Sequence, residues 1–404
     1  MNALMVRVGD VKIGVLERFE DARERFSFCD QYVSSLLGAR PVLGQIFEDR
    51  FPNAISVDGP ICWFTHLLPQ GVMLRWRSRL LGLDDHDTFE MLGQLGDDLP
   101  GAVYLEPCES ELRPKQTVTV VRREASETEA SLFRFSLAGA QWKLSARSAG
   151  RGLTTRAMSE GTSCIAKFHS PEYPGLPQCE FATMSWARAA GLCTPEFTLR
   201  HVSDFDRIPE EMPTGDGKVF VIERFDRTSA GRVHIEDFGQ ILDRPPGHSQ
   251  YFGSYEEIAS VVQWIAPNSV EELLKTIVFH VIAGNGDAHL KNFSVIYPDS
   301  RNAVLTPAYD MVSTLLYLNP GKEELALTLG GQKKFDSVNW HSFSQLIARL
   351  GLEQTAGEKI IRDFTDEAIG SWQQSDIQGN YSRQQIERMK VHLASLPITS
   401  RGTR

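Results

Sequence analysis

The chain of 404 residues lacks any apolar run that approaches the length needed to cross a bilayer. Its first residues alternate like a strand and lack the apolar centre of a signal peptide. Its six cysteines form no Cys-x-x-Cys pair and no zinc-ligand spacing, so free thiols in a reducing compartment explain them best. These absences predict a cytoplasmic protein with no membrane partner.

Composition and charge narrow the class of protein further. A hydrophobic content of 42% predicts a large core divided into two or three structural units. The formal net charge of −10 argues against broad electrostatic binding to nucleic acid or to an anionic membrane. Arg75, Arg77 and Arg79 could form a local basic patch, although a solvated helix face is the simpler interpretation.

The hydrophobic periodicity changes along the chain from the pattern of strands to the pattern of helices. The expected strands are Leu4–Val8, Val11–Arg18, Arg134–Leu137, Trp142–Ala146, Ser163–Phe168 and Val219–Arg224. The expected helices are Val72–Leu83, Leu176–Ala190, Tyr255–Ile265, Ser269–Ala283, Trp340–Leu350, Glu358–Gln373 and Arg383–Leu396. A β-rich half followed by a mainly helical half predicts an α+β fold with two lobes, and we expect segments 1–105, 106–227 and 228–404.

The most informative segment runs from His280 to Thr314. Asp287 follows the glycine-rich exit of an expected helix, Asn292 comes five residues later, and Asp310 follows a short strand. Metal-assisted phosphoryl transfer uses this order: an aspartate beside the attacking hydroxyl, then an asparagine and an aspartate that hold Mg²⁺ against the ATP phosphates. A solvated helix cap and a turn-forming aspartate are the plain alternatives. The crowding of Asp, His, Lys and Asn into six residues favours a site.

A metal hydrolase built on Asp287, His280 and His289 fits the sequence less well. His280 falls within an apolar helix, which is typical of a core histidine with its hydrogen bonds made. The chain also has no GxSxG nucleophile elbow, no GxxxxGK[ST] phosphate loop and no zinc motif.

Three upstream segments add to a nucleotide site. Lys167 is a single cation inside an apolar strand, so it needs anions nearby, and ATP phosphates with Glu180 would provide them. An edge-strand lysine that faces solvent is the alternative. Small residues in the turn Ser136–Lys143 let backbone N–H groups approach phosphate oxygens, and Lys143 adds charge. Backbone groups of Glu223–Phe225 could bind the adenine edge, although a hairpin or linker would explain them nearly as well.

These blocks together resemble the HipA family of bacterial serine/threonine kinase toxins. The matching blocks are SxAGAQxK at 136–143, the strand lysine Lys167, ERFDR at 223–227, and GNGDAHLKNFS through AYDMVS at 284–313. Weaker matches at Phe64–Gly71 and Leu95–Leu99 extend the similarity over nearly the whole chain. The resemblance implies a two-lobed protein-kinase-like fold related to the phosphoinositide kinases. Its parts would be an N-terminal subdomain, a β-rich nucleotide-binding lobe and a mainly helical catalytic lobe.

The resemblance also implies a role for each matching residue. Asp287 would be the catalytic aspartate, Asn292 and Asp310 would hold Mg²⁺, and Ser136 would be the autophosphorylated serine. The residues that would bind ATP are Ala138, Gly139, Ala140, Gln141, Trp142, Lys143, Lys167, Glu223, Arg224, Phe225, His289, Lys291 and Tyr309. Trp142 departs from the acidic or small residue that is common before the loop lysine, which bears on how freely the loop moves.

The function implied is an ATP- and Mg²⁺-dependent serine/threonine protein kinase that arrests growth by phosphorylating a translation-related protein, such as an aminoacyl-tRNA synthetase. The implied partner is a small helix-turn-helix antitoxin of the HipB type, and any DNA association would be indirect through it. Two alternatives stay open: a small-molecule or lipid phosphotransferase on the same scaffold, and a non-catalytic co-repressor subunit. The complete set of Asp287, Asn292 and Asp310 argues against the second.

Overall fold

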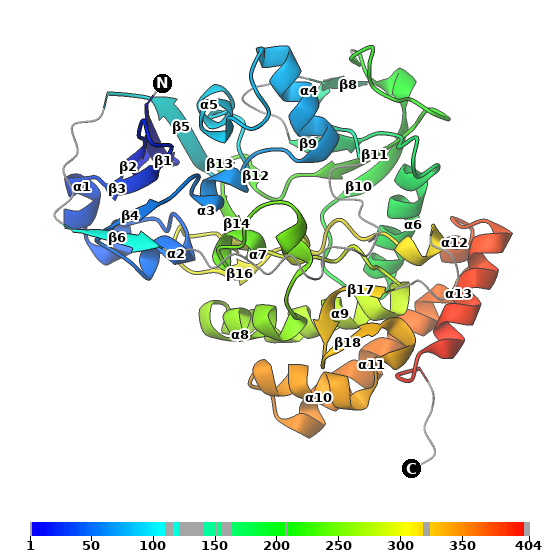
Figure 1. Cartoon of the computed structure of the whole chain (residues 1–404). Helices are drawn as coiled ribbons and strands as arrows, with labels where there is room; N and C mark the ends of the chain where they lie inside the picture. The colour runs from blue at the N-terminus through cyan, green and yellow to red at the C-terminus, as the bar shows by residue number, and fades with distance from the viewer. Residues whose placement is uncertain are drawn as a thin grey trace.

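The computed structural model describes residues 2–109, 116–120, 141–149, 152–155, 163–206, 208–317 and 324–399. Within these residues, most strands lie in the first three quarters of the chain, and helices dominate the last quarter (Figure 1). Figure 1 shows an N-terminal sheet in blue and cyan, a second sheet in cyan and green, and a helical part in yellow to red.

The N-terminal sheet is built on a hairpin. In the described residues its order is β5-β1-β2-β3-β4-β6. Its strands are β1 (Ala3–Val8), β2 (Val11–Arg18), β3 (Glu24–Phe28), β4 (Ala54–Val57), β5 (Val103–Pro107) and β6 (Thr117–Val120). The helices beside it are α1 (Asp30–Ser34), α2 (Gln45–Glu48), α3 (Cys62–Thr65), α4 (Gly71–Leu81) and α5 (Thr88–Gln94). Gly9 makes the β1–β2 turn at φ +56°, a backbone conformation that glycine adopts without strain.

The second sheet has the order β10-β11-β9-β7-β8 within the described residues. Its strands are β7 (Lys143–Ala149), β8 (Gly152–Thr155), β9 (Cys164–Lys167), β10 (Phe197–His201) and β11 (Lys218–Glu223). One face packs against α4, where Leu144 and Ala166 join Trp76 in a small core. The opposite face packs on α6 (Leu176–Ala189). Successive side chains of a strand point to opposite faces of the sheet. Lys143 and Lys167 are next to Leu144 and Ala166 in their strands, so they point to the α6 face.

The rest of the chain adds small sheets and a helical body. The strands are β12 (Arg227–Thr228), β13 (Gly231–Arg232), β14 (His234–Asp237), β15 (Ser294–Tyr297), β16 (Val304–Leu305), β17 (Glu324–Leu329) and β18 (Gln332–Lys334). The helices are α7 (Phe238–Ile241), α8 (Tyr255–Ile265), α9 (Val270–Ala283), α10 (Trp340–Arg349), α11 (Gln354–Trp372), α12 (Ser375–Gln378) and α13 (Arg383–Ser395). The main hydrophobic core lies among α6, α8, α9, α10 and α11.

Helix α9 runs through the centre of this core and ends where the polar loop begins. Every residue from Thr276 to Ala283 is buried. Gly284 ends the helix at φ +65°, and a Cβ there would lie 1.8 Å from a methyl carbon of Leu315. Glycine is therefore required at this position, and the chain turns sharply out of the core into the loop that carries Asp287.

Most of the expected elements are present, with ends that shift by a few residues. For example, α11 begins at Gln354 rather than at Glu358, because the Glu353 side chain accepts a hydrogen bond of 2.9 Å from the Ala356 N–H. The expected strand Arg134–Leu137 lies outside the described residues. The α+β fold is confirmed, whereas the relation to phosphoinositide kinases and the domain boundaries stay predictions.

One interpretation from the sequence is wrong. Arg77 does not belong to a solvated helix face, because it is 9% exposed, whereas Arg75 and Arg79 on the same helix are exposed. The Arg77 side chain lies on the face of α4 that points inward. Across the described residues, no helix combines the length and the apolar character that a membrane span needs.

Candidate active site

A cavity of about 380 Å³ lies where the N-terminal part, the second sheet and the loop after α9 meet. Its lining includes twelve of the predicted site residues: Gln141, Lys143, Lys167, Glu223, Arg224, Phe225, Asp287, His289, Lys291, Asn292, Tyr309 and Asp310. The cavity therefore gathers residues from positions 141 to 310 into one space. Ser136, Ala138, Gly139 and Ala140 lie outside the described residues.

Lys167 is a buried residue of the cavity wall. Only 4% of its surface is exposed, so the prediction of an inward-facing lysine holds and the solvent-facing alternative does not. Its ammonium contacts the carboxylates of Glu180 on α6 and of Asp310. Burial lowers the pKa of Lys167 from its ordinary value, and the charge of Glu180 opposes that change. One lysine thus joins the sheet, α6 and the segment after β16.

The start of β7 brings further polar groups to the same place. Lys143 lies directly opposite Lys167 in the β7–β9 pair. The Gln141 amide reaches Glu180 at 3.5 Å. Trp142 does not line the cavity. Its ring packs against that of Trp76, with the ring centroids 6.2 Å apart. Strand alternation explains this, because Trp142 points to the opposite face from Lys143.

The loop after α9 holds Asp287 in a buried and hydrogen-bonded position, with 6% of its surface exposed. The Asp287 N–H donates to the side chain of Asn285 at 3.0 Å. The Asn292 amide donates to the Asp287 carbonyl oxygen at 2.7 Å. The Tyr251 hydroxyl donates to Oδ1 of the Asp287 carboxylate at 2.7 Å. The backbone and the carboxylate are therefore both fixed by neighbours.

Asp310 has an unusual backbone conformation for a residue with a side chain. Its φ is +53°, in the left-handed region that aspartate tolerates better than most residues. The amide nitrogen of Asn292 donates to the Asp287 carbonyl oxygen, which leaves the amide oxygen of Asn292 as an acceptor for another partner. Asp310 and Asn292 both line the cavity, and carboxylate and amide oxygens are donors that suit a hard cation such as Mg²⁺.

His289, Lys291 and Tyr309 also line the cavity. Burial lowers the pKa of His289 to about 3, so its ring is neutral at pH 7. The Lys291 ammonium donates to the Asp237 carboxylate at 2.7 Å and to the His66 carbonyl oxygen at 3.0 Å. The Tyr309 hydroxyl donates to the Lys291 carbonyl oxygen at 2.9 Å. Lys291 is thus engaged by the N-terminal part of the chain through His66.

The segment after β11 forms a further wall of the cavity. The Glu223 N–H donates to the Glu196 carbonyl oxygen at 2.8 Å, and this bond continues the backbone ladder between β11 and β10. The Arg224 guanidinium turns to the Asp226 carboxylate, with contacts of 2.9 Å and 2.8 Å. The Phe225 ring packs 5.5 Å from the ring of Tyr309. The contact between Phe225 and Tyr309 connects the end of β11 to the segment after β16.

Sequence reasoning missed several polar residues that line the cavity or its wall. His66 and Asp237 bind Lys291, Arg77 reaches the cavity from α4, and Tyr251 binds Asp287. The sequence around Asp237 offered one signal, since Asp237 and Gln240 form a capping box at the start of α7. For Tyr251 the sequence offered no signal, because its partner is 36 residues away.

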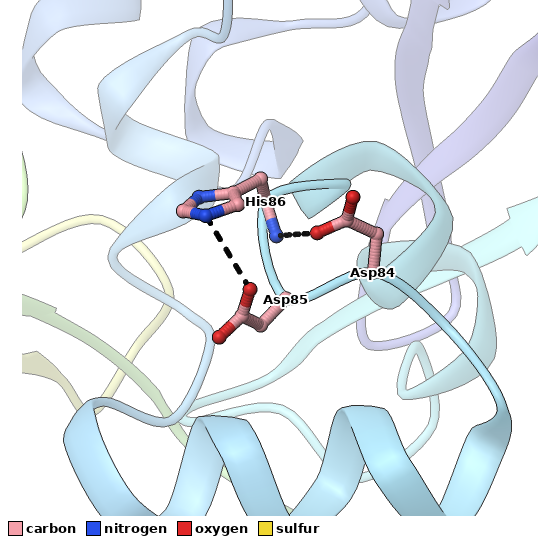
Figure 2. A group of neighbouring side chains, drawn as sticks. All are labelled: Asp84, Asp85 and His86. Carbon is pink, nitrogen blue, oxygen red and sulfur yellow. Dashed lines mark hydrogen bonds and ion pairs between the residues drawn. The ribbon is translucent and has the colours of Figure 1, made fainter.

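Other reactive side chains lie away from this chemistry. All six cysteines are free thiols, as the sequence predicts, and Cys164 and Cys179 are buried in the core. His280 is a buried core histidine, 3.1 Å from the Asn285 amide. Figure 2 shows Asp84, Asp85 and His86, which lie in the turn between α4 and α5 and not in the cavity. The Asp84 carboxylate there accepts a hydrogen bond of 2.9 Å from the His86 N–H, so it serves the turn itself.

Comparisons with known proteins agree on one family. A family model described as the HipA-like C-terminal domain matches residues 135–372, and one described as the HipA N-terminal domain matches residues 4–106. A protein of Sinorhizobium fredii named "Putative kinase Y4dM" is 34% identical, over 91% of this chain and 90% of that protein. The serine/threonine-protein kinase toxin HipA of Shewanella oneidensis is 26% identical, over 86% of this chain and 83% of its own.

The fold is shared with a solved structure. A chain from the Shewanella oneidensis MR-1 complex of HipA, HipB and operator DNA superposes with a TM-score of 0.70. The alignment covers 98% of this chain and 96% of that chain, at 21% sequence identity. The similarity therefore extends over the N-terminal part, the second sheet and the helical part together.

Proposed function

The chain belongs to the HipA family of kinase toxins, and we propose that it is an ATP- and Mg²⁺-dependent serine/threonine protein kinase. One observation carries the proposal: Lys167, paired with Glu180 and Asp310, lies in the same cavity as Asp287 and Asn292. Phosphoryl transfer needs a cation on the phosphates, oxygen donors for a metal ion and an aspartate beside the acceptor. Lys167, the pair Asn292 and Asp310, and Asp287 support the proposal because each offers the group that one of these needs calls for.

In the proposed reaction, each of these residues has a separate role. Lys167 binds the phosphates of ATP, and the carboxylate of Asp287 accepts the proton of the acceptor hydroxyl as that oxygen bonds to the γ-phosphorus. The bond between the γ-phosphorus and the bridging oxygen breaks, and ADP leaves. Asn292 and Asp310 would hold Mg²⁺, which neutralises charge on the phosphates when bound. The wall formed by Glu223, Arg224 and Phe225 would receive the adenine.

The partners follow from the relatives rather than from the cavity. The related Shewanella oneidensis protein is named as a toxin, and the solved complex of that organism contains HipA, HipB and operator DNA. We therefore expect a HipB-like antitoxin to bind this chain and any DNA contact to be made through it. The acceptor would be a translation-related protein, such as an aminoacyl-tRNA synthetase, and Ser136 would be an autophosphorylation site.

Intact-protein mass spectrometry after incubation with Mg²⁺ and ATP tests the proposal. Wild type should gain one phosphate, located on Ser136 by peptide mapping, and Asp287→Ala should gain none. Addition of a purified aminoacyl-tRNA synthetase should give a phosphorylated product with wild type only. Transfer that survives Asp287→Ala would show that the phosphate is moved by other residues.

A further inference from the structure

Tyr251 lies against the proposed catalytic aspartate, and neither the family resemblance nor the comparisons assign it a role. It ends a short 3-10 helix, His248–Tyr251, and is 3% exposed. Its hydroxyl donates to Oδ1 of Asp287 at 2.7 Å. Its ring meets the ring of His289 edge to face, with centroids 4.7 Å apart. Tyr251 therefore touches two residues of the loop that carries the chemistry.

The chain after Tyr251 holds it in place. Gly253 follows at φ +121°, and its carbonyl oxygen accepts a hydrogen bond of 3.1 Å from Thr328 on β17. Ser254 then caps α8 by accepting from the Glu257 N–H at 3.3 Å. A tight turn and a helix cap thus follow directly after the tyrosine. This arrangement limits the movement of its hydroxyl relative to Asp287.

The Tyr251 hydroxyl binds the carboxylate of Asp287, and two asparagines of the same loop bind its main chain. Asn285 and Asn292 bind the main-chain N–H and carbonyl of Asp287. Those two contacts do not reach the carboxylate, which interacts with the charge of Lys167 and accepts the hydrogen bond of Tyr251. A hydroxyl that donates to one carboxylate oxygen fixes the rotation of that carboxylate, and a hydrogen bond to an ionised group is stronger than one between neutral groups.

We propose that Tyr251 is a positioning residue for phosphoryl transfer, whose hydroxyl holds the Asp287 carboxylate in the orientation that meets the acceptor hydroxyl. This inference rests on the proposed kinase function. Tyr251 does not touch ATP in this scheme, so its loss should slow transfer without weakening nucleotide binding. General-base catalysis depends on geometry of this kind, since the base must lie within hydrogen-bonding reach of the proton it accepts.

Tyr255 offers a matched control in the same region. It lies four residues later, is fully buried, and donates its hydroxyl to the Ala288 carbonyl oxygen at 3.1 Å. Tyr251→Phe and Tyr255→Phe each remove one buried hydroxyl beside the same loop. Only the first of these two hydroxyl groups is bonded to the Asp287 carboxylate.

The experiment compares kcat and the KM for ATP of the full-length chain and both variants, with thermal melting as the measure of folding. Tyr251→Phe should lower kcat by about 10- to 100-fold and leave the KM for ATP within about twofold. Tyr255→Phe should change kcat by less than about threefold, although its melting temperature falls as much.

Three results would overturn the inference. Equal kcat in wild type and Tyr251→Phe would show that the hydroxyl is not needed. A rise in the KM for ATP at unchanged kcat would place Tyr251 in nucleotide binding. Phosphate found on Tyr251 itself would make it an acceptor. A wild-type chain that transfers no phosphate would instead refute the proposed function, and the role of Tyr251 with it.

Discussion

Lys143 and Lys167 lie directly opposite each other in the antiparallel pair β7–β9, on the same face of the sheet. Like charges in this arrangement repel, and the charge of Lys143 lowers the pKa of Lys167. The carboxylates of Glu180 and Asp310 offset the charge of Lys167. A ligand that carries several negative charges would relieve the remaining repulsion, which is the physical reason for expecting phosphates here.

The two lysines should respond differently to removal. Lys167→Ala leaves Glu180, which is fully buried, without its cation, so the free energy of unfolding should fall by about 3 kcal/mol. Lys143→Ala removes both the repulsion of Lys167 and an attraction to Glu180, so it should leave stability nearly unchanged. Both variants should weaken ATP binding about tenfold or more. Calorimetric titration with ATP and urea unfolding measure the two effects separately. Unchanged ATP affinity in Lys167→Ala would show that the wrong lysine was placed at the phosphates.

Asp310 allows the charge of a proposed metal ligand to be tested apart from its backbone. Asparagine also tolerates the left-handed conformation at φ +53°, and Lys167 keeps Glu180 as a carboxylate partner, so Asp310→Asn should still fold. Because the variant lacks the carboxylate, Mg²⁺ should no longer strengthen ATP binding, and transfer should fall by at least about 100-fold. The measurement is the ATP affinity with and without Mg²⁺. An Mg²⁺ effect equal to that of wild type would exclude Asp310 as a metal ligand.

Local sequence predicted the parts of the site that lie close together in the chain. Asp287 and Asn292 are five residues apart in one loop, and Lys167 is an isolated cation in an apolar strand, so pattern and spacing were sufficient to predict that they share one cavity. Tyr251 and His66 could not be found in this way, because tertiary packing alone brings them to the loop. Arg77 was misread because its helix looks solvated until the second sheet covers one face.

Lys291 lines the cavity, and the resemblance implies that it binds ATP. In the structure its ammonium also binds Asp237 and His66. Lys291→Met should therefore loosen the contact between the N-terminal part and the catalytic loop, and the free energy of unfolding should fall by about 2 kcal/mol. Limited proteolysis and urea unfolding measure this. A variant of unchanged stability that binds ATP more weakly would favour the role assigned from the family.

Glu236 should make stability depend on pH in a way that one substitution can reveal. Its fully buried carboxylate accepts hydrogen bonds from the Gln45 N–H at 3.0 Å, the Trp63 ring N–H at 2.8 Å and the Tyr297 hydroxyl at 2.8 Å. Burial raises its pKa to about 7, from 4.5. The folded chain therefore holds this proton more tightly than the unfolded chain does. The stability that Glu236 contributes is complete below pH 4.5 and is lost as the pH rises through about 7.

Glu236→Gln is neutral at every pH and should remove this dependence. Between pH 5 and pH 8 the free energy of unfolding of wild type should fall relative to the variant, by up to about 3 kcal/mol. Burial lowers the pKa of His234 to about 4 and that of His280 to about 3, which gives the opposite slope, but both histidines are present in both chains. Urea unfolding at pH 5, 6, 7 and 8 gives the difference directly.

Glu367→Gln is the control, because Glu367 is exposed, and its curve of unfolding free energy against pH should run parallel to that of wild type. If the curve of Glu236→Gln also runs parallel, the Glu236 carboxyl is ionised as readily in the folded chain as in water, and it does not hold a proton near neutral pH.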